Sequence, residues 1–295
     1  MKIALWSANP MLGDVEANVE TVVRAVKARE ADVVAFPEMF LTGYNIGDEA
    51  SRLAFKASDE RLEPILSACA KSKVALAVGA PRKGRPGVIH NSSLLVDETG
   101  EARWQDKRVL PTFTTFQEGL FFTPGKDSKV WETRHAAFGV GICYDLYFPE
   151  LQRLQVLRGA DVLLNLSASP STSRRFFELL LQARAVENAV FSCYSNNVGA
   201  QDGLVFWGGS CAIGPRGQGL AALEPYEEGR AIAELDLRDL QAAREFRPTV
   251  RDAKEADAAA LAAVTGLRPA APRAGARATR PKRAGKGAGK GKGGK

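Results

Sequence analysis

Hydrophobic residues follow two alternating patterns along this chain. Short apolar runs recur from the N-terminus onward, and between them apolar residues return every three or four positions. The first pattern is typical of strands buried on both faces, and the second of amphipathic helices. The sequence therefore predicts an α/β fold in which helices cover the outside of buried sheets.

The two patterns give definite candidate elements. The predicted strands are MKIALWSANP, Asp32–Phe36, Val74–Ala80, Asn91–Val96, Ala102–Lys107, Phe138–Ile142, Asp161–Leu166, AVFSCYS, GGSCAIG and GRAIAELD. The strands on either side of the turn Asp97–Gly100 are expected to form a hairpin. The predicted helices are a valine-striped one capped by Asp14, one around Asp59–Ala70, Pro149–Arg158, and Ser173–Asn188 with Ser173 as its cap.

Composition divides the chain in two. The 295 residues are 45% hydrophobic and 25% charged, which is ordinary for a globular protein. Ten of the 40 Lys and Arg residues lie in 267–295, which has no acidic residue, so the rest holds 30 basic and 34 acidic residues. Because 267–295 also lacks large apolar residues after Leu267, we predict a folded domain of residues 1–266 and a basic, low-complexity, disordered tail.

Cysteine spacing and hydropathy indicate the compartment. The four cysteines are far apart and form no CxxC pair, the N-terminus lacks the features of a secretory leader, and no apolar run approaches 18 residues. We therefore expect a cytoplasmic protein with reduced thiols and no membrane span.

Three segments carry a reactive residue at the end of a predicted strand. In the first, FPEMFLTGY, Glu38 follows Asp32–Phe36 and has apolar neighbours. Desolvation at such a place raises the pKa of a carboxyl group toward the range of a general base. A lone glutamate of this kind is more often a surface residue of a turn, so the assignment depends on the other two segments.

The second segment is DKRVLPTFTTFQEG. Lys107 ends a strand ahead of a loop rich in phenylalanine, where a fixed positive charge can stabilise an oxyanion. Glu118 follows in the same segment and can hold that lysine or accept a proton. Taken alone, Lys107 and Arg108 would be a solvated basic pair.

The third segment is FGVGICYDLYFPE. Cys143 follows a strand and precedes a helix that begins near Pro149, so we expect an exposed thiol next to free backbone N–H groups. Positive charge or a helix N-terminus lowers a thiol pKa from its usual roughly 8.5. A buried structural role fits Cys69, Cys193 and Cys211 better, because their neighbours are ordinary helix or strand residues.

Other catalytic arrangements lack the residues they need. The two histidines, His90 and His135, lie at a strand start and in a polar connection, and neither is a good candidate for the base of a Cys–His pair. The sequence shows no metal-ligand spacing, phosphate-binding GxxxxGKS/T segment or dinucleotide fingerprint. If the protein is an enzyme, we therefore expect a carboxylate base and no metal.

Together, the three segments resemble the nitrilase (carbon–nitrogen hydrolase) superfamily, whose mark is a Glu–Lys–Cys triad in this order. FPEMFLTGY, DKRVLP and GICYDLYFPE match its glutamate, lysine and nucleophile segments, and FQEG matches a segment with a second glutamate. The resemblance covers roughly residues 1–255. It implies that Glu38 is the general base, Lys107 the oxyanion-stabilising cation, Cys143 the nucleophile and Glu118 a supporting group.

The resemblance also implies a fold and a reaction. The fold would be a four-layer αββα sandwich that usually dimerises through its outer helices, so we expect a homodimer or a higher homo-oligomer. Cys143 would attack an amide, carbamoyl or nitrile carbon and expel ammonia or an amine, and water activated by Glu38 would hydrolyse the thioester. Lys107 and the backbone N–H of Tyr144 would hold the oxyanion, and no cofactor would be needed.

The substrate is less well defined. NLSASP and QDGLVFWGGS are similar to the glutaminase domains of NAD synthetases, but the chain lacks an ATP-binding SGGxDS segment. We therefore favour a stand-alone amidase, acting on a small linear amide or N-carbamoyl compound, over a glutaminase that supplies a separate synthetase chain. A true nitrilase is less favoured, because many nitrilases have Trp directly after the nucleophile and this sequence has Tyr144 there. Candidate substrate contacts are Phe113, Tyr144, Tyr147 and Arg174; a solvated or interface role fits Arg174 equally well.

A binding function of the tail is the competing hypothesis of a different class. Its ten positive charges could contact nucleic acid or an acidic partner, with an affinity that falls steeply with salt. The tail has no aromatic residues for base stacking, and the rest of the chain is acidic. We therefore favour a solubilising appendage.

Overall fold

The computed structural model describes residues 1–264. They comprise a first compact unit, Met1–Asp252, and the start of a second, Ala253–Lys295, whose described part contains helix α8 (Glu255–Val264). The predicted tail, 267–295, and the predicted domain boundary at 266 lie outside the described residues. Within residues 1–264, no helix has the length and apolar character needed to cross a membrane.

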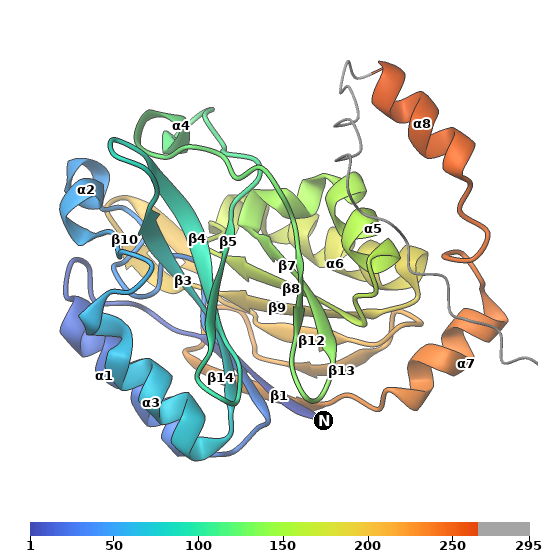
Figure 1. Ribbon diagram of the computed structural model, residues 1–295, viewed down its shortest axis with the longest axis horizontal. Helices are drawn as coiled ribbons and strands as arrows, with labels where there is room; N and C mark the ends of the chain where they lie inside the picture. Colours follow the sequence, from blue (N-terminus) through green and yellow to red (C-terminus); the bar gives the residue numbers. More distant parts are fainter. Residues whose placement is uncertain (265–295) are drawn as a thin grey trace, which may run out of the picture. The chain divides into compact units, whose positions relative to one another are not determined.

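Two six-stranded sheets form the centre of the first unit (Figure 1). Their strands are β1 (Lys2–Ser7), β2 (Val33–Ala35), β3 (Ala75–Lys83), β4 (Ile89–Val96), β5 (Ala102–Asp106), β6 (Val130–Glu132), β7 (Ala137–Ile142), β8 (Val162–Ser167), β9 (Phe191–Asn196), β12 (Cys211–Ile213), β13 (Gly219–Ala222) and β14 (Gly229–Glu234). The order is β14-β1-β2-β3-β4-β5 in one sheet and β13-β12-β9-β8-β7-β6 in the other. A separate hairpin pairs β10 (Val198–Gln201) with β11 (Leu204–Trp207).

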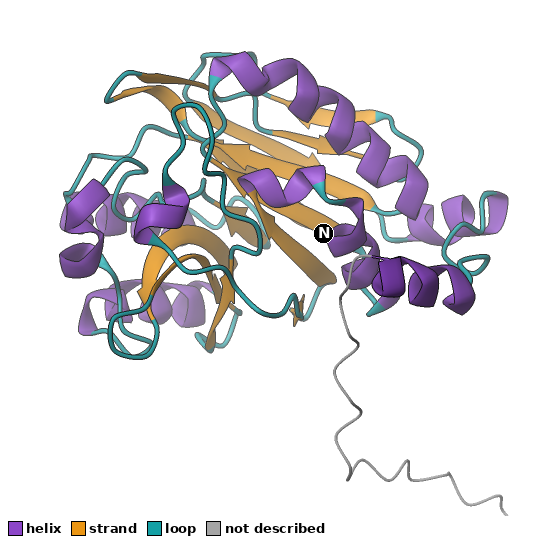
Figure 2. Ribbon diagram, turned by 90° about the horizontal axis from the view of Figure 1, so that it is seen from above, coloured by secondary structure: helices purple, strands orange, loops and turns teal. Residues whose placement is uncertain are grey.

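Helices cover the outer face of each sheet (Figure 2). Helices α1 (Val15–Lys27) and α3 (Glu63–Ser72) pack on the first sheet, and α5 (Pro149–Leu157) and α6 (Arg174–Asn188) pack on the second. The other helices of this unit are α2 (Ala50–Leu53), α4 (Glu118–Phe121) and α7 (Arg238–Phe246). The layers therefore follow the order helix, sheet, sheet, helix, and the predicted αββα sandwich is confirmed.

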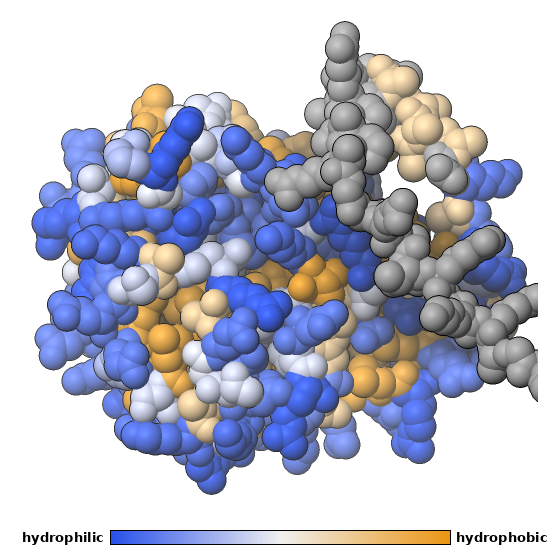
Figure 3. Space-filling view, viewed as in Figure 1, coloured by the Kyte–Doolittle hydropathy of each residue, from blue (hydrophilic) through white to orange (hydrophobic). Residues whose placement is uncertain are grey.

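The sandwich has two hydrophobic layers around its first sheet. On β1, Ile3 and Leu5 belong to the cluster between the two sheets, whereas Ala4 belongs to the cluster beneath α1 and α3. Strands buried on both faces explain the uninterrupted apolar runs of the sequence. The edge strand β14 instead alternates between buried and half-buried or exposed positions. The face in Figure 3 is mainly hydrophilic, with apolar patches between charged side chains.

Most of the predicted elements are confirmed, but one predicted cap is wrong. Asp14 caps α1 as expected, because its carboxylate accepts a hydrogen bond from the N–H of Ala17 (3.1 Å). Ser173 does not cap α6 through its side chain. The 3₁₀ turn η4 (Ser171–Ser173) leads directly into α6, and its backbone already has the right-handed helical conformation at Ser173. A side-chain cap normally requires an extended residue there.

Candidate active site

The predicted reactive residues lie at strand ends from both sheets. Glu38 follows β2 and Lys107 follows β5, both in the first sheet, and Cys143 follows β7 in the second. Strand β5 runs in the same direction as β2, because two antiparallel pairings separate it from β3 and β3 is parallel to β2. The carboxyl ends of these strands therefore meet at one edge, which is the usual place for a site in such folds.

Lys107 joins two carboxylates in the interior. Its Nζ donates to Glu38 Oε1 (2.7 Å) and to Glu118 Oε1 (2.6 Å), and none of its side chain is exposed. Burial opposes the charge on this amine, but Glu118 and Glu38 outweigh it and raise the pKa of Lys107 above its ordinary value. Lys107 is therefore a permanent cation, and an ammonium group has one more hydrogen to donate.

Glu38 is completely buried. A buried carboxylate needs hydrogen-bond donors to offset the loss of water. Besides Lys107, the side-chain amide of Asn91 donates to its Oε1 (2.7 Å) and the backbone N–H of Ala168 donates to its Oε2 (2.7 Å). Asn91 lies in β4 and Ala168 follows β8, so both sheets hold this carboxylate. Met39, the next residue, has a positive φ of 55°, which indicates local strain.

Glu118 completes the buried charge cluster. The hydroxyl of Tyr44 donates to its Oε1 (2.7 Å), and Asn91 donates to its Oε2 (3.3 Å). Burial raises the pKa of Glu118 to about 7, although Lys107 acts in the opposite direction. Lys107 therefore faces two carboxylates, and the charge of the cluster changes near neutral pH.

Cys143 lies at a strained turn next to this cluster. It begins the 3₁₀ turn η3 (Cys143–Tyr147) with a φ of +45°, a conformation that costs a non-glycine residue free energy. The expectation of an exposed thiol is wrong, because Cys143 is only 6% exposed. Burial raises the pKa of the Cys143 thiol well above its usual value, Glu38 raises it further, and Lys107 lowers it. The thiol therefore needs a base to remove its proton.

Aromatic rings surround the turn that carries Cys143. The ring of Tyr144 contacts those of Phe113 (5.3 Å between centroids) and Tyr147 (5.2 Å). Tyr147 in turn contacts Phe177 on α6. The guanidinium of Arg174 pairs with Glu178 at 2.7 Å and is partly exposed. Three of the predicted substrate contacts therefore form one aromatic cluster beside the thiol, whereas Arg174 is paired with Glu178 and lies over the ring of Trp207, which belongs to the same hydrophobic cluster as Cys143.

Three contributors to the site were not assigned from the sequence: Tyr44, Asn91 and Asp145. Tyr44 belongs to the same segment as Glu38, and Asn91 is one of the buried polar residues in the first half of β4 (IHNSSLLV). A polar side chain in a strand buried on both faces is a usable signal, because it needs a partner there. Asp145 is 3% exposed and accepts backbone N–H groups.

Neither histidine contacts the cluster of Glu38, Lys107 and Glu118 in the described part of the chain. His90 Nδ1 lies 2.7 Å from the carbonyl oxygen of Thr123, and His135 Nε2 lies 3.7 Å from Asp32 Oδ1. Within residues 1–264, no group of three or more His, Cys, Asp and Glu side chains could hold a metal ion.

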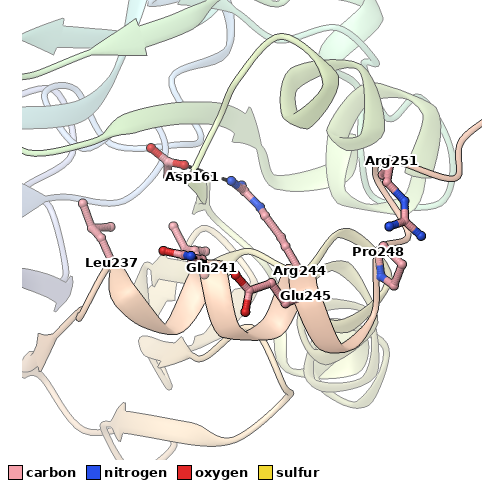
Figure 4. A pocket seen from close by; sticks show the side chains of 8 residues that line it. Asp161, Leu237, Gln241, Arg244, Glu245, Pro248 and Arg251 are labelled. Carbon is pink, nitrogen blue, oxygen red and sulfur yellow. Dashed lines mark hydrogen bonds and ion pairs between the residues drawn. The ribbon is translucent and has the colours of Figure 1, made fainter.

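A pocket of about 450 Å³ lies beside helix α7, away from the charge cluster (Figure 4). Arg244 on α7 points toward Asp161, at 3.5 Å. Asp161 precedes β8, whereas Ala168, which holds Glu38, follows the same strand. This pocket therefore belongs to the opposite end of β8 from the candidate active site.

The fold and the site define a cysteine-containing α/β sandwich with a buried Glu–Lys–Glu cluster. The carbon–nitrogen hydrolase family model matches residues 2–245. The chain therefore belongs to the carbon–nitrogen hydrolase (nitrilase) family, as the sequence motifs indicated.

Relatives within this family differ in what they do. An (R)-stereoselective amidase from Pseudomonas sp. is 32% identical over 256 residues, which cover 85% of this chain and 91% of the amidase. A glutamine-dependent NAD(+) synthetase from Aquifex aeolicus is 29% identical over 250 residues. That match covers 83% of this chain but only 44% of the synthetase, so the chain spans less than half of this relative's length.

One similar solved structure is an amidase in which a ligand is bound covalently to the active-site cysteine. It is a glutamate-to-glutamine variant of the amidase from Nesterenkonia sp. AN1, with the acetamide moiety of fluoroacetamide attached to its active-site cysteine. It is 27% identical to this chain, with a TM-score of 0.77, and the alignment covers 88% of this chain and 96% of that one.

Proposed function

We propose that the protein is an amidase that hydrolyses a non-peptide carbon–nitrogen bond of a small linear amide or N-carbamoyl compound and releases ammonia. The observation that carries this proposal is the buried cluster of Glu38, Lys107 and Glu118 beside the Cys143 thiol. A thiol with a raised pKa needs an adjacent base, and a buried fixed cation can stabilise an oxyanion. Amidases among the relatives and solved structures also support it.

In the proposed first half-reaction, Glu38 takes the thiol proton as Cys143 Sγ attacks the carbonyl carbon. The electron pair of the carbonyl bond moves to oxygen, where the third N–H hydrogen of Lys107 and the backbone N–H of Tyr144 stabilise the negative charge. The tetrahedral intermediate then collapses to a thioester. The carbon–nitrogen bond breaks, and the proton held by Glu38 passes to the leaving nitrogen, which departs as ammonia.

In the second half-reaction, Glu38 removes a proton from water. The hydroxide formed attacks the thioester carbon, and the same oxyanion donors stabilise the second tetrahedral intermediate. Cys143 leaves as a thiolate and regains the proton from Glu38, and the carboxylic acid is released. We assign Glu118 the role of holding Lys107 in place, because their side chains lie 2.6 Å apart.

The aromatic cluster favours an uncharged acyl group. Phe113, Tyr144 and Tyr147 offer ring faces and edges beside the thiol, and aromatic surfaces contribute mainly apolar burial. A substrate carboxylate would need a guanidinium without a partner, and that of Arg174 is paired with Glu178. We therefore propose a neutral amide as the preferred substrate. Contact of these rings and of Arg174 with substrate stays a prediction.

The test is ammonia release from a panel of neutral amides, ω-amides, N-carbamoyl amino acids and glutamine. We expect turnover to be highest with a neutral amide. Cys143→Ala should reduce ammonia release to background while the midpoint of chemical unfolding stays unchanged. Cys211→Ala, a half-buried cysteine in β12, is the matched control and should keep its activity. An active Cys143→Ala protein would refute the proposal.

A second candidate function is a glutaminase that supplies ammonia to a separate synthetase chain. The similarity to the Aquifex aeolicus NAD(+) synthetase favours it. In this case glutamine would exceed every other amide in the panel, by a factor that rises when a synthetase is added. We rank it second because Arg174, the cation that we predicted as a substrate contact, is already paired with Glu178 and is not free for the α-carboxylate of glutamine.

We also propose that two copies associate through α5 and α6. These outer helices expose four large apolar side chains: Leu154, Leu157, Phe176 and Leu179. Exposed apolar patches of this kind are typical of protein–protein interfaces. Sedimentation should show a dimer that Leu157→Glu weakens and that Leu12→Glu, on an exposed loop before α1, does not change.

A further inference from the structure

Asp145 is a buried carboxylate in η3, the turn that begins with the proposed nucleophile, and the proposed reaction gives it no role. It is the third residue of η3 and is 3% exposed. Its Oδ1 accepts from the backbone N–H of Val109 (2.8 Å) and of Arg108 (3.1 Å), and its Oδ2 accepts from that of Ile142 (3.1 Å) and, at a longer distance, of Arg108 (3.3 Å). Its two oxygens therefore bind two separate segments of the chain.

These segments are the ones that carry the proposed nucleophile and the cation. Arg108 directly follows Lys107, and Ile142 directly precedes Cys143. The strands before them, β5 and β7, belong to different sheets, so no backbone ladder fixes one relative to the other. The carboxylate of Asp145 thus connects the cation to the nucleophile across the sandwich.

The strain at Cys143 shows why such a connection is needed. A non-glycine residue at positive φ costs on the order of 1–3 kcal/mol and persists only where the surrounding structure holds it. Gln152 donates to the carbonyl oxygen of Asp145 (2.9 Å), and Arg184 donates to that of Leu146 (2.9 and 3.2 Å). These bonds come from the outer helices, whereas Asp145 supplies the only side-chain bonds that we find, within residues 1–264, from η3 to the segment that follows β5.

The charge state of Asp145 fits this role. Burial raises its pKa to about 6, and Lys107 and the three backbone N–H groups act in the opposite direction. The group is therefore ionised at neutral pH, when both oxygens can accept hydrogen bonds.

We propose that Asp145 is a positioning residue that sets the distance between Lys107 and Cys143. The proposal rests on the amidase function given above. In Asp145→Asn, an amide replaces the carboxylate, and one of its two faces becomes an N–H₂ donor. In either orientation of the amide, that donor faces the N–H of Val109 or the N–H of Ile142, so one of these two N–H groups loses its acceptor.

The test compares Asp145→Asn with Asp97→Asn. Asp97 also accepts backbone N–H groups, those of Thr99 (2.8 Å) and Glu101 (3.0 Å), but it lies in the turn between β4 and β5. With the best amide of the panel, Asp145→Asn should lower kcat about 10–100-fold and change KM by less than about threefold, because small displacements of reacting groups cost that much. Asp97→Asn should change neither constant by more than about twofold.

Two further measurements keep the proposal testable. If Asp145→Asn does not fold, Gln152→Leu replaces it: this change removes one bond to the Asp145 carbonyl, and we expect kcat to fall about 3–10-fold with KM unchanged. The rate at which iodoacetamide alkylates Cys143, followed by peptide mass spectrometry, requires no turnover. We expect it to change at least about fivefold in Asp145→Asn or Gln152→Leu and not in Asp97→Asn.

The outcomes separate the two proposals. If the wild-type protein releases no ammonia from any amide, the proposed function fails, and the alkylation rates still decide the role of Asp145. The positioning role is overturned if the wild-type protein is active but Asp145→Asn keeps its kcat, differs from the wild type only in KM, or behaves like Asp97→Asn.

Discussion

At the scale of single residues, the site depends on one ammonium group shared by two buried carboxylates. Lys107 Nζ lies 2.7 Å from Glu38 Oε1 and 2.6 Å from Glu118 Oε1, with all three side chains nearly or fully buried. Desolvation of such a cluster is expensive, and only close pairing offsets it. The three charges are therefore interdependent: removal of one changes the energy of the other two.

Removal of the Lys107 charge should destabilise the protein strongly. Lys107→Met leaves Glu38 and Glu118 buried without a cation, and breaking a buried pair in this way costs about 3–5 kcal/mol. Unfolding by urea, followed by circular dichroism, measures the loss. Adding Glu118→Gln to the same chain should recover part of it, since one uncompensated charge disappears. Equal stability of Lys107→Met and wild type would show that the cluster is already neutral in the folded protein.

The sequence predicted the residues with reactive groups but not the residues that hold them. Glu38, Lys107 and Cys143 each end a strand, and this position is visible in the apolar pattern. Asn91 lies 53 residues from Glu38, with which it shares a hydrogen bond, and no local pattern encodes such a pairing. The φ of +45° at Cys143 and its 6% exposure likewise result from the packing of two sheets around it.

At the scale of elements, the close approach of two neighbouring strands places the proposed base. Leu41 and Phe36 bond to β3 through their N–H groups, so the turn after β2 runs along that strand. At Gly79, a Cβ atom would lie 2.2 Å from Met39 N and 2.5 Å from Glu38 Cα. Only glycine fits this position, because the atoms it would meet are backbone atoms that cannot rotate away.

Gly79→Ala should therefore displace Glu38 as well as lower stability. We expect the free energy of unfolding to fall by roughly 1–3 kcal/mol, because the backbone is forced to shift, and kcat to fall at least about 100-fold. Gly219→Ala on β13 is the matched control, because a Cβ there meets nothing within 4 Å. Thermal unfolding and ammonia release of the two variants decide the matter. Wild-type turnover in Gly79→Ala would mean that Glu38 tolerates displacement.

Elements with long apolar runs were predictable, and short irregular ones were not. The strands that became β3, β7 and β8 are runs of six to nine residues with few polar interruptions, so the apolar pattern and the length agree. The hairpin of β10 and β11 and the strands β6 and β13 have only three or four residues each. Runs of that length carry too little pattern by themselves; the equally short β2 and β12 were predicted because each lies within a longer predicted run.

At the scale of the whole molecule, the charge cluster links stability to pH. The pKa of Glu118 is raised to about 7 from an ordinary 4.5, with burial as the main cause. Between those two values the folded protein keeps a proton that the unfolded chain releases. Folding stability from this group is therefore fully present below about pH 4.5, falls as pH rises, and is lost above about pH 7.

Glu118→Gln should remove this pH dependence. Between about pH 5 and about pH 8, the free energy of unfolding of the wild type should fall by roughly 1–3 kcal/mol more than that of the variant. Urea unfolding at a series of pH values measures the difference. Parallel curves for the two proteins would place the titration on another group.

The last prediction concerns the basic segment that follows the family domain. Every residue of the proposed site precedes Asp252, and the family model ends at residue 245. Deletion of 267–295 removes ten positive charges and leaves a chain with 30 basic and 34 acidic residues, so the segment dominates the net charge without supplying a site residue. We expect kcat and KM of the truncated protein to stay within about twofold of wild type, because the proposed chemistry uses short-range contacts that bulk charge perturbs little. The measurement is ammonia release at low and high salt. A loss above about tenfold would assign the segment a part in catalysis, and a salt-sensitive affinity for DNA confined to the full chain would support the binding hypothesis.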